Sequence, residues 1–492
     1  MILSTAVHGD LRRASCLTLA LALTALPLTT ALAEESPDAG TARPKDASTA
    51  DRAADEDYRP WRLREELLLP DWLWFEGEHR TRFEYVGNQF RAGSSGDNHA
   101  VSMRTLLRLE LRYDMLALGG EFEDSRVYYE DREAPINTTV VNSLELLQAY
   151  LKLDIGRYLG DDVTSWVRAG RLTTDFGSRR LVARNRYRNT INAFTGVEGL
   201  FEVDEIKIKA LAATPVQRRP TRFRQLRENE HQLDREHEDV HFWGYHVSGE
   251  ILEGQFIEHY IFGLNESDSH DRPTRNREIY SWGLRYLKKK AVNDWDMDIE
   301  GVYQFGNSRA TSSRFDRTNL QHRAFFVHAA AGYTFDCPWT PRVVLQYDYA
   351  SGDRDPTDKD NERFDTLFGA RRFEFGPTGI YGLIARSNLN SPGLRVEVKP
   401  DKSLSAFFGY RAFWLADKTD AWVAAGIQDP TGNSGRFVGH QLEARVRWKI
   451  LPGNLMWEIG GVTLIRGRFA RTAPGANAGE PIQGYSQLVL KF

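Results

Sequence analysis

The sequence predicts an all-β protein, a transmembrane antiparallel β-barrel of about 18 strands with a water-filled, charged lumen. Three observations predict this fold. Long segments alternate strictly between apolar and ionised residues, the one long apolar run belongs to an N-terminal export signal, and the chain ends in an alternating segment that closes on an aromatic residue. Strands therefore have to cross any membrane that the mature chain spans.

The alternating segments define strands with two chemically different faces. In residues 74–85, 103–114 and 441–450, apolar side chains such as Phe83 take one parity and ionised side chains such as Arg82 take the other. Period-2 alternation is typical of a strand with one apolar and one polar face. The segments run for about 10–14 residues, whereas strands of soluble proteins average about 5–6 residues and membrane barrels need about 9–11. An apolar face toward lipid and a charged face toward the lumen explain both features.

The N-terminal region predicts export. Arg12 and Arg13 precede an apolar run over residues 16–28, and small residues follow, which predicts a cleaved signal peptide over residues 1–33. Residues 34–60 are rich in Ala, Asp, Pro, Thr and Ser and predict a flexible periplasmic N-terminal segment, so the outer-membrane barrel is expected over residues 61–492. Aromatic residues near strand ends are placed as interfacial girdles would be: Trp72, Tyr113, Trp295, Trp414 and Trp448.

The last strand carries a further signal. Residues 485–491 alternate and Phe492 ends the chain, a pattern that resembles the recognition signal of bacterial outer-membrane barrels. The expected partners are therefore the barrel-assembly machinery, through Phe492, together with outer-membrane lipid and lipopolysaccharide. Because both termini of such barrels are periplasmic, the strand number is expected to be even. A barrel of about 16–18 strands leaves a water-filled lumen unless loops fill it.

Composition excludes several classes of protein. Lys and Arg number 64 against 68 Asp and Glu, a net charge of −4, so no nucleic-acid partner is expected. The hydrophobic fraction of 41% and the aromatic fraction of 12% are too high for a disordered chain. With Cys16 and Cys337 as the two cysteines, neither a disulfide framework nor a multi-cysteine zinc site can form, and no cofactor is expected beyond the calcium considered below.

Several motifs, in order along the chain, resemble the alginate export family of bacterial outer-membrane barrels. They occupy residues 168–171, 176–182, 192–197, 349–353, 364–368, 375–376 and 439–443. The resemblance implies an 18-stranded pore with an arginine-rich lumen, through which a secreted anionic polysaccharide leaves the periplasm. It also implies an anionic polysaccharide or oligosaccharide, alginate or a relative, as the transported partner, and periplasmic secretion proteins as further partners.

Arginines concentrate in one segment of this region. The candidates for the substrate path there are Arg168, Arg171, Arg179, Arg184, Arg186 and Arg188. A guanidinium binds carboxylates bidentately and keeps its charge, so arginines folded inward from the wall would hold a positive field in a narrow lumen. Three interpretations remain open: substrate selectivity, lumen scaffolding paired with neighbouring glutamates, and a solvated basic loop.

Strand parity extends the list of candidates. Arg168 and Arg171 differ in parity, so both cannot face the lumen from one regular strand. Further arginines are expected to face the lumen, although parity does not predict substrate contact: Arg82, Arg104, Arg108, Arg112, Arg395, Arg411, Arg445 and Arg447.

Three other motifs are given structural interpretations. Residues 218–224 form a basic stretch within a long loop, whose length would allow it to cover a pore mouth, although a solvated loop is favoured. Residues 237–241, with the sequence HEDVH, match the zinc-protease pattern, but that chemistry needs both histidines on one helical turn, and a strand is expected to start at Val240. A loop with Asp353, Asp355, Asp358 and Asp360 offers oxygen ligands for structural calcium, yet its spacing misses the EF-hand pattern, so a solvated acidic loop is favoured.

These observations predict a passive, substrate-selective channel of the bacterial outer membrane and not an enzyme. The leading hypothesis is translocation of an anionic, alginate-like polysaccharide from periplasm to cell exterior. A general or uptake porin for small anions or oligosaccharides is the first alternative. An outer-membrane enzyme such as a lipase or protease is the second, and within the sequence only the match at residues 237–241 supports it.

Overall fold

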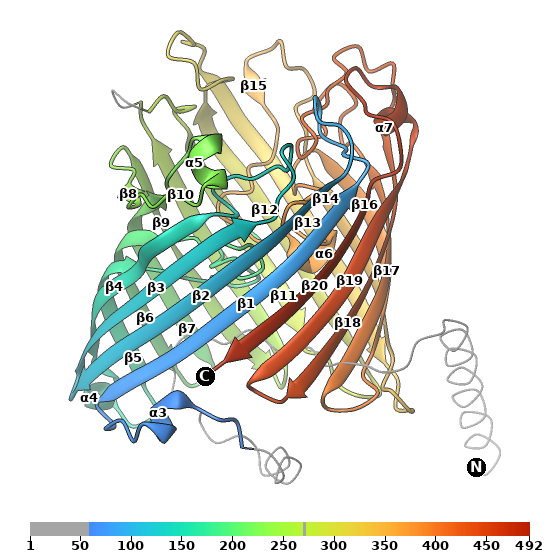
Figure 1. Ribbon diagram of the computed structural model, residues 1–492. Helices are drawn as coiled ribbons and strands as arrows, with labels where there is room; N and C mark the ends of the chain where they lie inside the picture. The colour runs from blue at the N-terminus through green and yellow to red at the C-terminus, as the bar shows by residue number, and fades with distance from the viewer. Residues whose placement is uncertain (1–58, 269–271) are drawn as a thin grey trace, which may run out of the picture.

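Eighteen antiparallel strands close into one barrel in the computed structural model, which describes residues 59–268 and 272–492 (Figure 1). The predicted fold and strand number are thereby confirmed. The predicted signal peptide and residues 34–58 of the predicted N-terminal segment lie outside the described residues.

The strands follow one another around the barrel in chain order. Each pairs antiparallel with the next barrel strand, β7 pairs with β9, β14 pairs with β16, and β20 closes the ring on β1. The first half of the ring consists of β1 (Leu73–Gly87), β2 (Asn98–Tyr113), β3 (Leu116–Tyr128), β4 (Asn142–Asp154), β5 (Thr164–Leu172), β6 (Phe194–Val203), β7 (Ile206–Gln217), β9 (Val240–Leu252) and β10 (Gln255–Glu266). The second half consists of β11 (Glu278–Lys288), β12 (Asp294–Ser308), β13 (Leu320–Thr334), β14 (Arg342–Ala350), β16 (Leu389–Val398), β17 (Leu404–Trp414), β18 (Phe437–Leu451), β19 (Leu455–Arg466) and β20 (Ile482–Lys491).

The remaining elements are short and belong to the connections. Two strands have only two residues each. β8 (Arg235–Glu236) pairs with β7, and β15 (Asp360–Asn361) pairs with β13. The helices are α3 (Leu63–Glu66), α4 (Gly156–Leu159), α5 (Phe223–Arg227), α6 (Arg372–Phe375) and α7 (Arg468–Thr472). In the described part of the chain, no helix is long and apolar enough to cross a membrane.

The barrel wall has the two faces that the alternation predicts. Phe83, Leu109 and Trp448 are 46%, 44% and 43% exposed on the outer surface, whereas Arg82 and Arg104 of the opposite parity are 0% and 2% exposed. Large apolar side chains exposed in such number match a lipid environment and not water. Four of the five girdle candidates lie toward the end with the short turns, namely Trp72, Tyr113, Trp295 and Trp448. The fifth, Trp414, lies at the end of β17 toward the long loops.

The two ends of the barrel carry connections of different length. Short turns such as the one at Asp114 lie at the lower end in Figure 1, next to the C-terminus, and long loops lie at the upper end. In outer-membrane barrels the short turns are periplasmic and the long loops extracellular, and the two ends are named accordingly.

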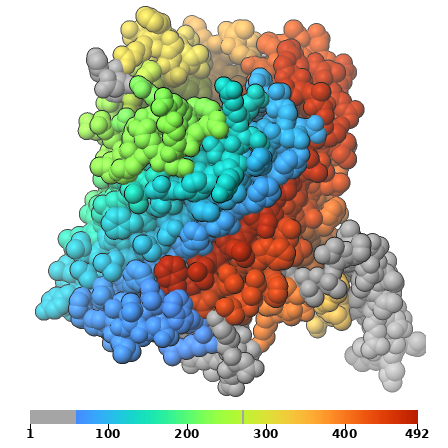
Figure 2. All heavy atoms as spheres, viewed as in Figure 1, coloured from blue at the N-terminus to red at the C-terminus, as the bar shows by residue number. Residues whose placement is uncertain are grey.

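The first and last strands form the closing seam of the barrel. Figure 2 shows the blue N-terminal strand and the red C-terminal strand in contact along this seam. At its periplasmic end, Gly77 and Phe492 exchange backbone hydrogen bonds of 2.8 and 3.0 Å. A Cβ atom at position 77 would overlap the Phe492 ring, so glycine provides the space that the terminal aromatic side chain occupies.

Two extracellular loops turn back into the barrel. They are the β5–β6 loop, residues 173–193, and the β14–β16 loop, residues 351–388. The two loops meet at a β-bridge between Val182 and Phe368. The Phe368 ring packs edge to face against Phe194 and Phe242, at centroid distances of 5.1 and 5.0 Å. The hydrophobic core therefore lies inside the barrel, where the two loops pack against inward-facing wall residues.

Candidate functional site

The predicted wall arginines lie on the lumen side, and wall carboxylates neutralise most of them. Arg104 lies 2.7 Å from Glu78, and Arg411 lies 2.7 Å from Asp348. An ion within a poorly hydrated wall is stable when such a partner is present. The other pairs join Arg108 and Arg112 to Glu110, Arg168 to Glu198, Arg395 to Glu397, and Arg445 and Arg447 to Glu458. The interpretation as paired lumen scaffolding describes this set.

Buried wall arginines also anchor the β5–β6 loop inside the barrel. The Arg82 guanidinium donates a 2.6 Å hydrogen bond to the Tyr187 carbonyl and lies 4.1 Å from the centroid of the Tyr187 ring. Arg104 donates to the carbonyls of Arg186 and Arg188 at 2.9 and 3.0 Å. These donors satisfy loop carbonyls that the strand ladders leave without partners. Arg82 and Arg104 therefore hold the loop in place.

The same loop is fixed to the opposite side of the ring through Arg180. This side chain binds Asp298 and Glu300 of β12 at 2.9 and 2.5 Å. It also binds Glu374 of α6 at 3.0 Å, so one guanidinium joins both inward-folded loops to the wall. Because β1 and β2 lie almost opposite β12 in the ring, the β5–β6 loop crosses the lumen and narrows the path through it.

A cluster of arginines from four extracellular loops differs from the wall arginines. Arg91, Arg188, Arg218 and Arg371, here named the loop arginines, follow β1, β5, β7 and β14. Within the described residues, none of the four has a carboxylate at ion-pair distance. Three of them donate to neutral carbonyls, which belong to Tyr381, Thr138, Ile191 and Ile384. The Arg188 guanidinium has no hydrogen-bond partner in the described chain.

The loop arginines are close enough to repel one another. Burial, followed by repulsion from Arg218 and Arg371, lowers the pKa of Arg188 to about 9. Burial, followed by repulsion from Arg371, lowers the pKa of Arg91 to about 10. All four side chains still carry a positive charge at neutral pH. Arg218 is also attracted to the more distant carboxyl groups of Glu123 and Asp234. No carboxylate forms an ion pair with any of the four within the described residues, so their region of the lumen holds an excess of positive charge, which favours a mobile anion there.

The predicted arginine segment divides between paired and unpaired side chains. Arg168 binds Glu198, whereas Arg171, of the other parity, binds Glu145 and Glu236. Arg184 binds Glu121 at 2.5 Å, and Arg186 binds Glu78 at 3.3 Å. The Arg179 guanidinium lies 4.1 Å from the centroid of the Phe373 ring. Of the six candidates, Arg188 belongs to the loop arginines.

Sequence reasoning missed part of this arrangement. It did not single out Arg91, Arg371 or Arg80, although Arg80 shares the lumen-facing parity of Arg82 and donates to the same loop. It also assigned residues 218–224 to a solvated loop. That interpretation is wrong at its first residue, because Arg218 donates to two loop carbonyls at 2.7 and 3.0 Å and is partly buried at the barrel mouth.

The zinc-like motif is not assembled into a metal site. His241 lies in β9 and His237 in the preceding loop, so the two histidines do not share a helical turn. Across residues 59–268 and 272–492, no group of three or more His, Cys, Asp or Glu side chains is arranged to hold a metal ion.

The aspartates considered for calcium are used mainly within turns. Asp355 accepts hydrogen bonds from Thr357, and Asp358 accepts one from the Asp360 backbone N–H. Asp353 instead packs near Asp420, and burial followed by repulsion from Asp420 raises its pKa to about 6. Calcium at this loop stays a prediction without a ligand cluster to support it.

Comparison with known sequences identifies a family. The model of a protein family described as alginate export matches residues 71–482, which is most of the chain. No curated protein sequence matches the chain.

Comparison with solved structures identifies the fold of outer-membrane porins. OccK1 (OpdK) of Pseudomonas aeruginosa superposes with a TM-score of 0.54 at 10% identity, over 85% of this chain and 98% of its own. A BenF-like porin from Pseudomonas fluorescens Pf-5 gives a TM-score of 0.53 at 10% identity, over 85% and 99%. OccAB1 of Acinetobacter baumannii gives 0.51 at 12% identity, over 85% and 96%. The family and the fold together place the protein in the bacterial outer membrane as a channel.

Proposed function

The chain belongs to the alginate export family, and from that membership we propose that it passively and selectively translocates an anionic polysaccharide, alginate or a relative, from the periplasm to the cell exterior. The observation that carries the proposal is the cluster of loop arginines. Positive charge that is not held in ion pairs lies there, on the path that the β5–β6 loop narrows.

Uronic acid polymers have the chemistry that suits this cluster. Each sugar carries a carboxylate, and a guanidinium can bind it through two parallel hydrogen bonds. Because the four side chains come from four loops, a carboxylate released by one arginine meets another before it leaves the region. Conduction requires each contact to be weak enough to break, and partly hydrated arginines that repel one another meet this requirement.

Two structural features support a selective channel over an open pore. The β5–β6 and β14–β16 loops pack inside the barrel, so the path is narrower than the 18-stranded ring. The wall around them carries little net charge, because most of its arginines are paired with carboxylates. Selection by charge is then concentrated at the loop arginines.

A porin for small anions or oligosaccharides is the second candidate. The packing of two loops within the lumen favours it, since a narrow path admits small solutes more easily than a polymer. In both candidates the direction of transport is set by the concentration gradient of the solute, because the channel is passive. The family and the fold point to a channel in either case, and not to an enzyme.

Single-channel recording separates the two candidates. The purified protein is inserted into a planar bilayer, its anion-to-cation permeability ratio is recorded, and polymannuronate is added to the periplasmic side. A neutral dextran of equal length is the matched control. The proposal expects anion selectivity and brief current blocks by polymannuronate but not by dextran. Anion selectivity with blocks by mannuronate monomer or dimer and none by the polymer would support the small-anion porin, and cation selectivity would overturn both.

A further inference from the structure

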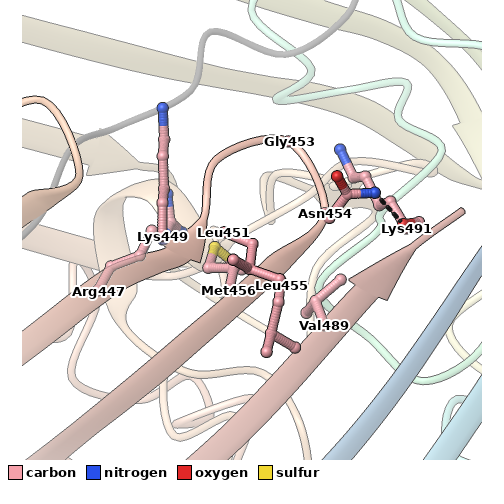
Figure 3. Close-up of a pocket in the computed structure, with 9 residues that line it drawn as sticks. All are labelled: Arg447, Lys449, Leu451, Gly453, Asn454, Leu455, Met456, Val489 and Lys491. Carbon is pink, nitrogen blue, oxygen red and sulfur yellow. Dashed lines mark hydrogen bonds between the residues drawn. The ribbon is translucent and has the colours of Figure 1, made fainter. Parts of the chain in front are cut away.

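The barrel wall is closed to its last residues at the periplasmic end. Around the pocket in Figure 3, β18 stays paired with β19 as far as Leu451 and Leu455, and Leu455 is paired in turn with Leu490 of β20. Strands that pair up to a short turn leave no gap between them.

The extracellular end is different beside β4. This strand begins at Asn142, yet it pairs with β5 only over Ala149–Asp154. The reason is that the chain leaves the wall after Leu172 and returns to it at Phe194, with the β5–β6 loop folded into the lumen between them. Residues 142–148 therefore form an edge with which no strand of the described chain pairs on the side of β5. Such an edge leaves a gap in the wall, with unpaired backbone groups, unless another segment covers it.

The β7–β9 loop, residues 218–239, covers this gap. Its two ends lie side by side, because β7 and β9 are paired neighbours and β8 of the loop pairs with the last residues of β7. Its middle reaches across to β3 and β4, and Figure 1 shows α5 of the loop near the extracellular ends of these strands. Three strand spacings, about 14 Å, separate β4 from β7. The loop is thus attached to one side of the gap and contacts the other.

Hydrogen bonds hold the middle of the loop to β3 and β4. The Asn229 side-chain amide accepts a hydrogen bond from the Val127 N–H at 2.8 Å and donates one to the Val127 carbonyl at 2.7 Å. The Ser143 hydroxyl donates to the Asn229 carbonyl at 3.1 Å, and His231 Nδ1 lies 2.8 Å from the Ser143 carbonyl oxygen. The loop therefore gives a partner to a carbonyl of the β4 edge.

Two acidic residues of the loop add further contacts. Asp234 accepts a hydrogen bond from the Asn142 amide at 3.0 Å, and the Asp234 N–H donates to Glu145 at 2.8 Å. Glu236 binds Arg171 of β5 at 2.9 Å. These contacts across the gap are polar, so water can replace them when the loop moves away.

Little of the large apolar surface of the loop is buried. Leu226 is 2% exposed, whereas Phe223 and Leu233 are 48% and 64% exposed. A segment held by polar contacts and few buried apolar side chains opens locally at a lower cost than the strands around it. The paired strands β7 and β9 stay in place during such an opening and act as its hinge.

The β7–β9 loop also borders the proposed path of the substrate. Its first residue, Arg218, is one of the loop arginines and donates to the Ile191 carbonyl of the β5–β6 loop at 3.0 Å. The gap therefore lies where the β5–β6 loop enters the lumen.

We propose that the β7–β9 loop is a lid, hinged at β7 and β9 and closed on β3 and β4, whose opening enlarges the extracellular outlet of the channel at the gap beside β4. A polymer that has passed the loop arginines leaves through this outlet. The exit of a polymer rests on the proposed function, whereas the opening of the lid does not.

Reversible cross-linking tests whether the lid moves. In the mature chain with Cys337→Ser, Glu130→Cys in the β3–β4 loop is combined with Arg227→Cys, a pair whose wild-type side chains lie 3.0 Å apart. The matched control is Arg224→Cys with Glu228→Cys, whose wild-type side chains lie 2.9 Å apart within the lid itself. A short bifunctional thiosulfonate reagent joins each pair, and a reductant releases it.

Single-channel recording without any polymer is the measurement. The proposal expects brief openings to a higher conductance in the unlinked protein, their loss when positions 130 and 227 are linked, and their return on reduction. Linking positions 224 and 228 should leave the openings unaltered. Openings that persist with positions 130 and 227 linked, or an unlinked protein without openings, would overturn the proposal.

Substitution of Asn229 tests the contacts that close the lid. Its backbone is left-handed, with φ at 50°, so Asn229→Gly removes both hydrogen bonds to Val127 without adding strain. The loss of two hydrogen bonds should make openings about tenfold more frequent. Gln232→Gly is the matched control, because the Gln232 side chain donates to Glu230 of the same loop. An equal effect of the two substitutions would refute the closing role of these contacts.

Polymannuronate added to the periplasmic side tests the exit. Its current blocks should last about tenfold longer with positions 130 and 227 linked than after reduction, because release then depends on a narrower outlet. Blocks by mannuronate dimer should not change. Equal block durations for the polymer would refute exit through the lid. A wild type that polymannuronate does not block would refute the proposed function, while the openings recorded without polymer still decide whether the lid exists.

Discussion

Removing the charge of Arg188 is expected to weaken the interaction of the pore with anions while leaving the barrel folded. Arg188 lies in the β5–β6 loop, and its guanidinium binds no carboxylate of the described chain. The substitution Arg188→Gln therefore leaves no buried carboxylate without its partner, which is the usual reason that losing a charge unfolds a protein. The Arg188 carbonyl still accepts the hydrogen bonds from Arg80 and Arg104 that hold the loop.

The expected magnitude follows from the hydration of the site. Two unit charges about 4 Å apart interact by about 1 kcal/mol in bulk water and by about 4 kcal/mol at an effective dielectric constant of 20. Arg188 is half-buried, which places the interaction between these two figures, and we take the lower one as the minimum loss. A loss of about 1 kcal/mol corresponds to roughly a fivefold rise in the polymannuronate concentration that blocks half of the current. The effect should shrink as salt is raised from 0.1 to 1 M, because the screening length falls from about 10 to about 3 Å.

Arg186 provides the matched control two residues away in the same loop. The Arg186 side chain is 44% exposed, and this residue is more exposed than Arg188, but its guanidinium lies 3.3 Å from Glu78. If the uncompensated charge decides the interaction, Arg186→Gln should change the blocking concentration less than twofold. If exposure decides it, Arg186→Gln should have the larger effect. An unaltered block in Arg188→Gln, or a larger effect in Arg186→Gln, would refute the assignment of selectivity to the loop arginines.

Three further changes test the anchors of the barrel and its loops. Replacing Arg180 by Met leaves the buried Glu300 without an ion pair, whereas Asp298 keeps Arg285 and Glu374 keeps Arg386. The loss of about 3–5 kcal/mol should release the β5–β6 loop and raise single-channel conductance. Arg224→Met, at an exposed pair, should do neither. Gly77→Val places a side chain where the Phe492 ring lies and should lower the free energy of unfolding of the barrel by about 1–3 kcal/mol. The measurement is the temperature at which the barrel changes from its folded to its unfolded mobility on gels, which should fall. Gly484→Ala is the control, because the position has open space around it. Burial followed by repulsion from Glu145 raises the pKa of Asp234 to about 7. The folded arrangement of the loop that carries Asp234, residues 218–239, therefore loses stability as pH rises through 7, because the buried carboxyl group is then ionised. Opening of residues 218–239 should therefore increase about tenfold from pH 6 to pH 8 in hydrogen exchange corrected for intrinsic rates, and the Asp234→Asn variant should lose this dependence.

The wall could be predicted from the sequence because its pattern is local. Lipid on one side and the lumen on the other impose a period of two on each strand, so the parity of Phe83 and Arg82 follows from a segment of about ten residues. The even strand number was predicted separately, from the periplasmic position of both termini of such barrels. The ion pairs of the wall also depend on strand register, as Arg168 of β5 stands opposite Glu198 of β6. Register is harder to predict than parity, because it depends on both strands and on the turn between them.

The loop arginines could not be predicted in the same way. Residues 88–97 and 351–388 have no period that indicates which side chains point inward. Their placement depends on contacts between distant parts of the chain, such as the ion pair between Arg180 and Asp298, which are 118 residues apart. Arg188 was identified because it lies in a conspicuous arginine-rich segment, whereas Arg371 lies in a segment of mixed charge.

The division between wall and loops follows from the cost of burying a charge. Most wall arginines, with lipid behind their strand and packed loops in front, are paired with a carboxylate, and such a pair carries little net field into the lumen. Arg80 is an exception, since backbone carbonyls of the β5–β6 loop accept its hydrogen bonds instead. Arg218 and Arg371 of the loop arginines are instead solvated by backbone carbonyls, so they keep their charge without an ion pair. The charge selectivity that we propose is therefore expected to come from the loops. Substitution of a loop arginine should then change substrate preference with little loss of stability. Substitution of a paired wall arginine should lower stability, because its buried carboxylate partner is left without a cation.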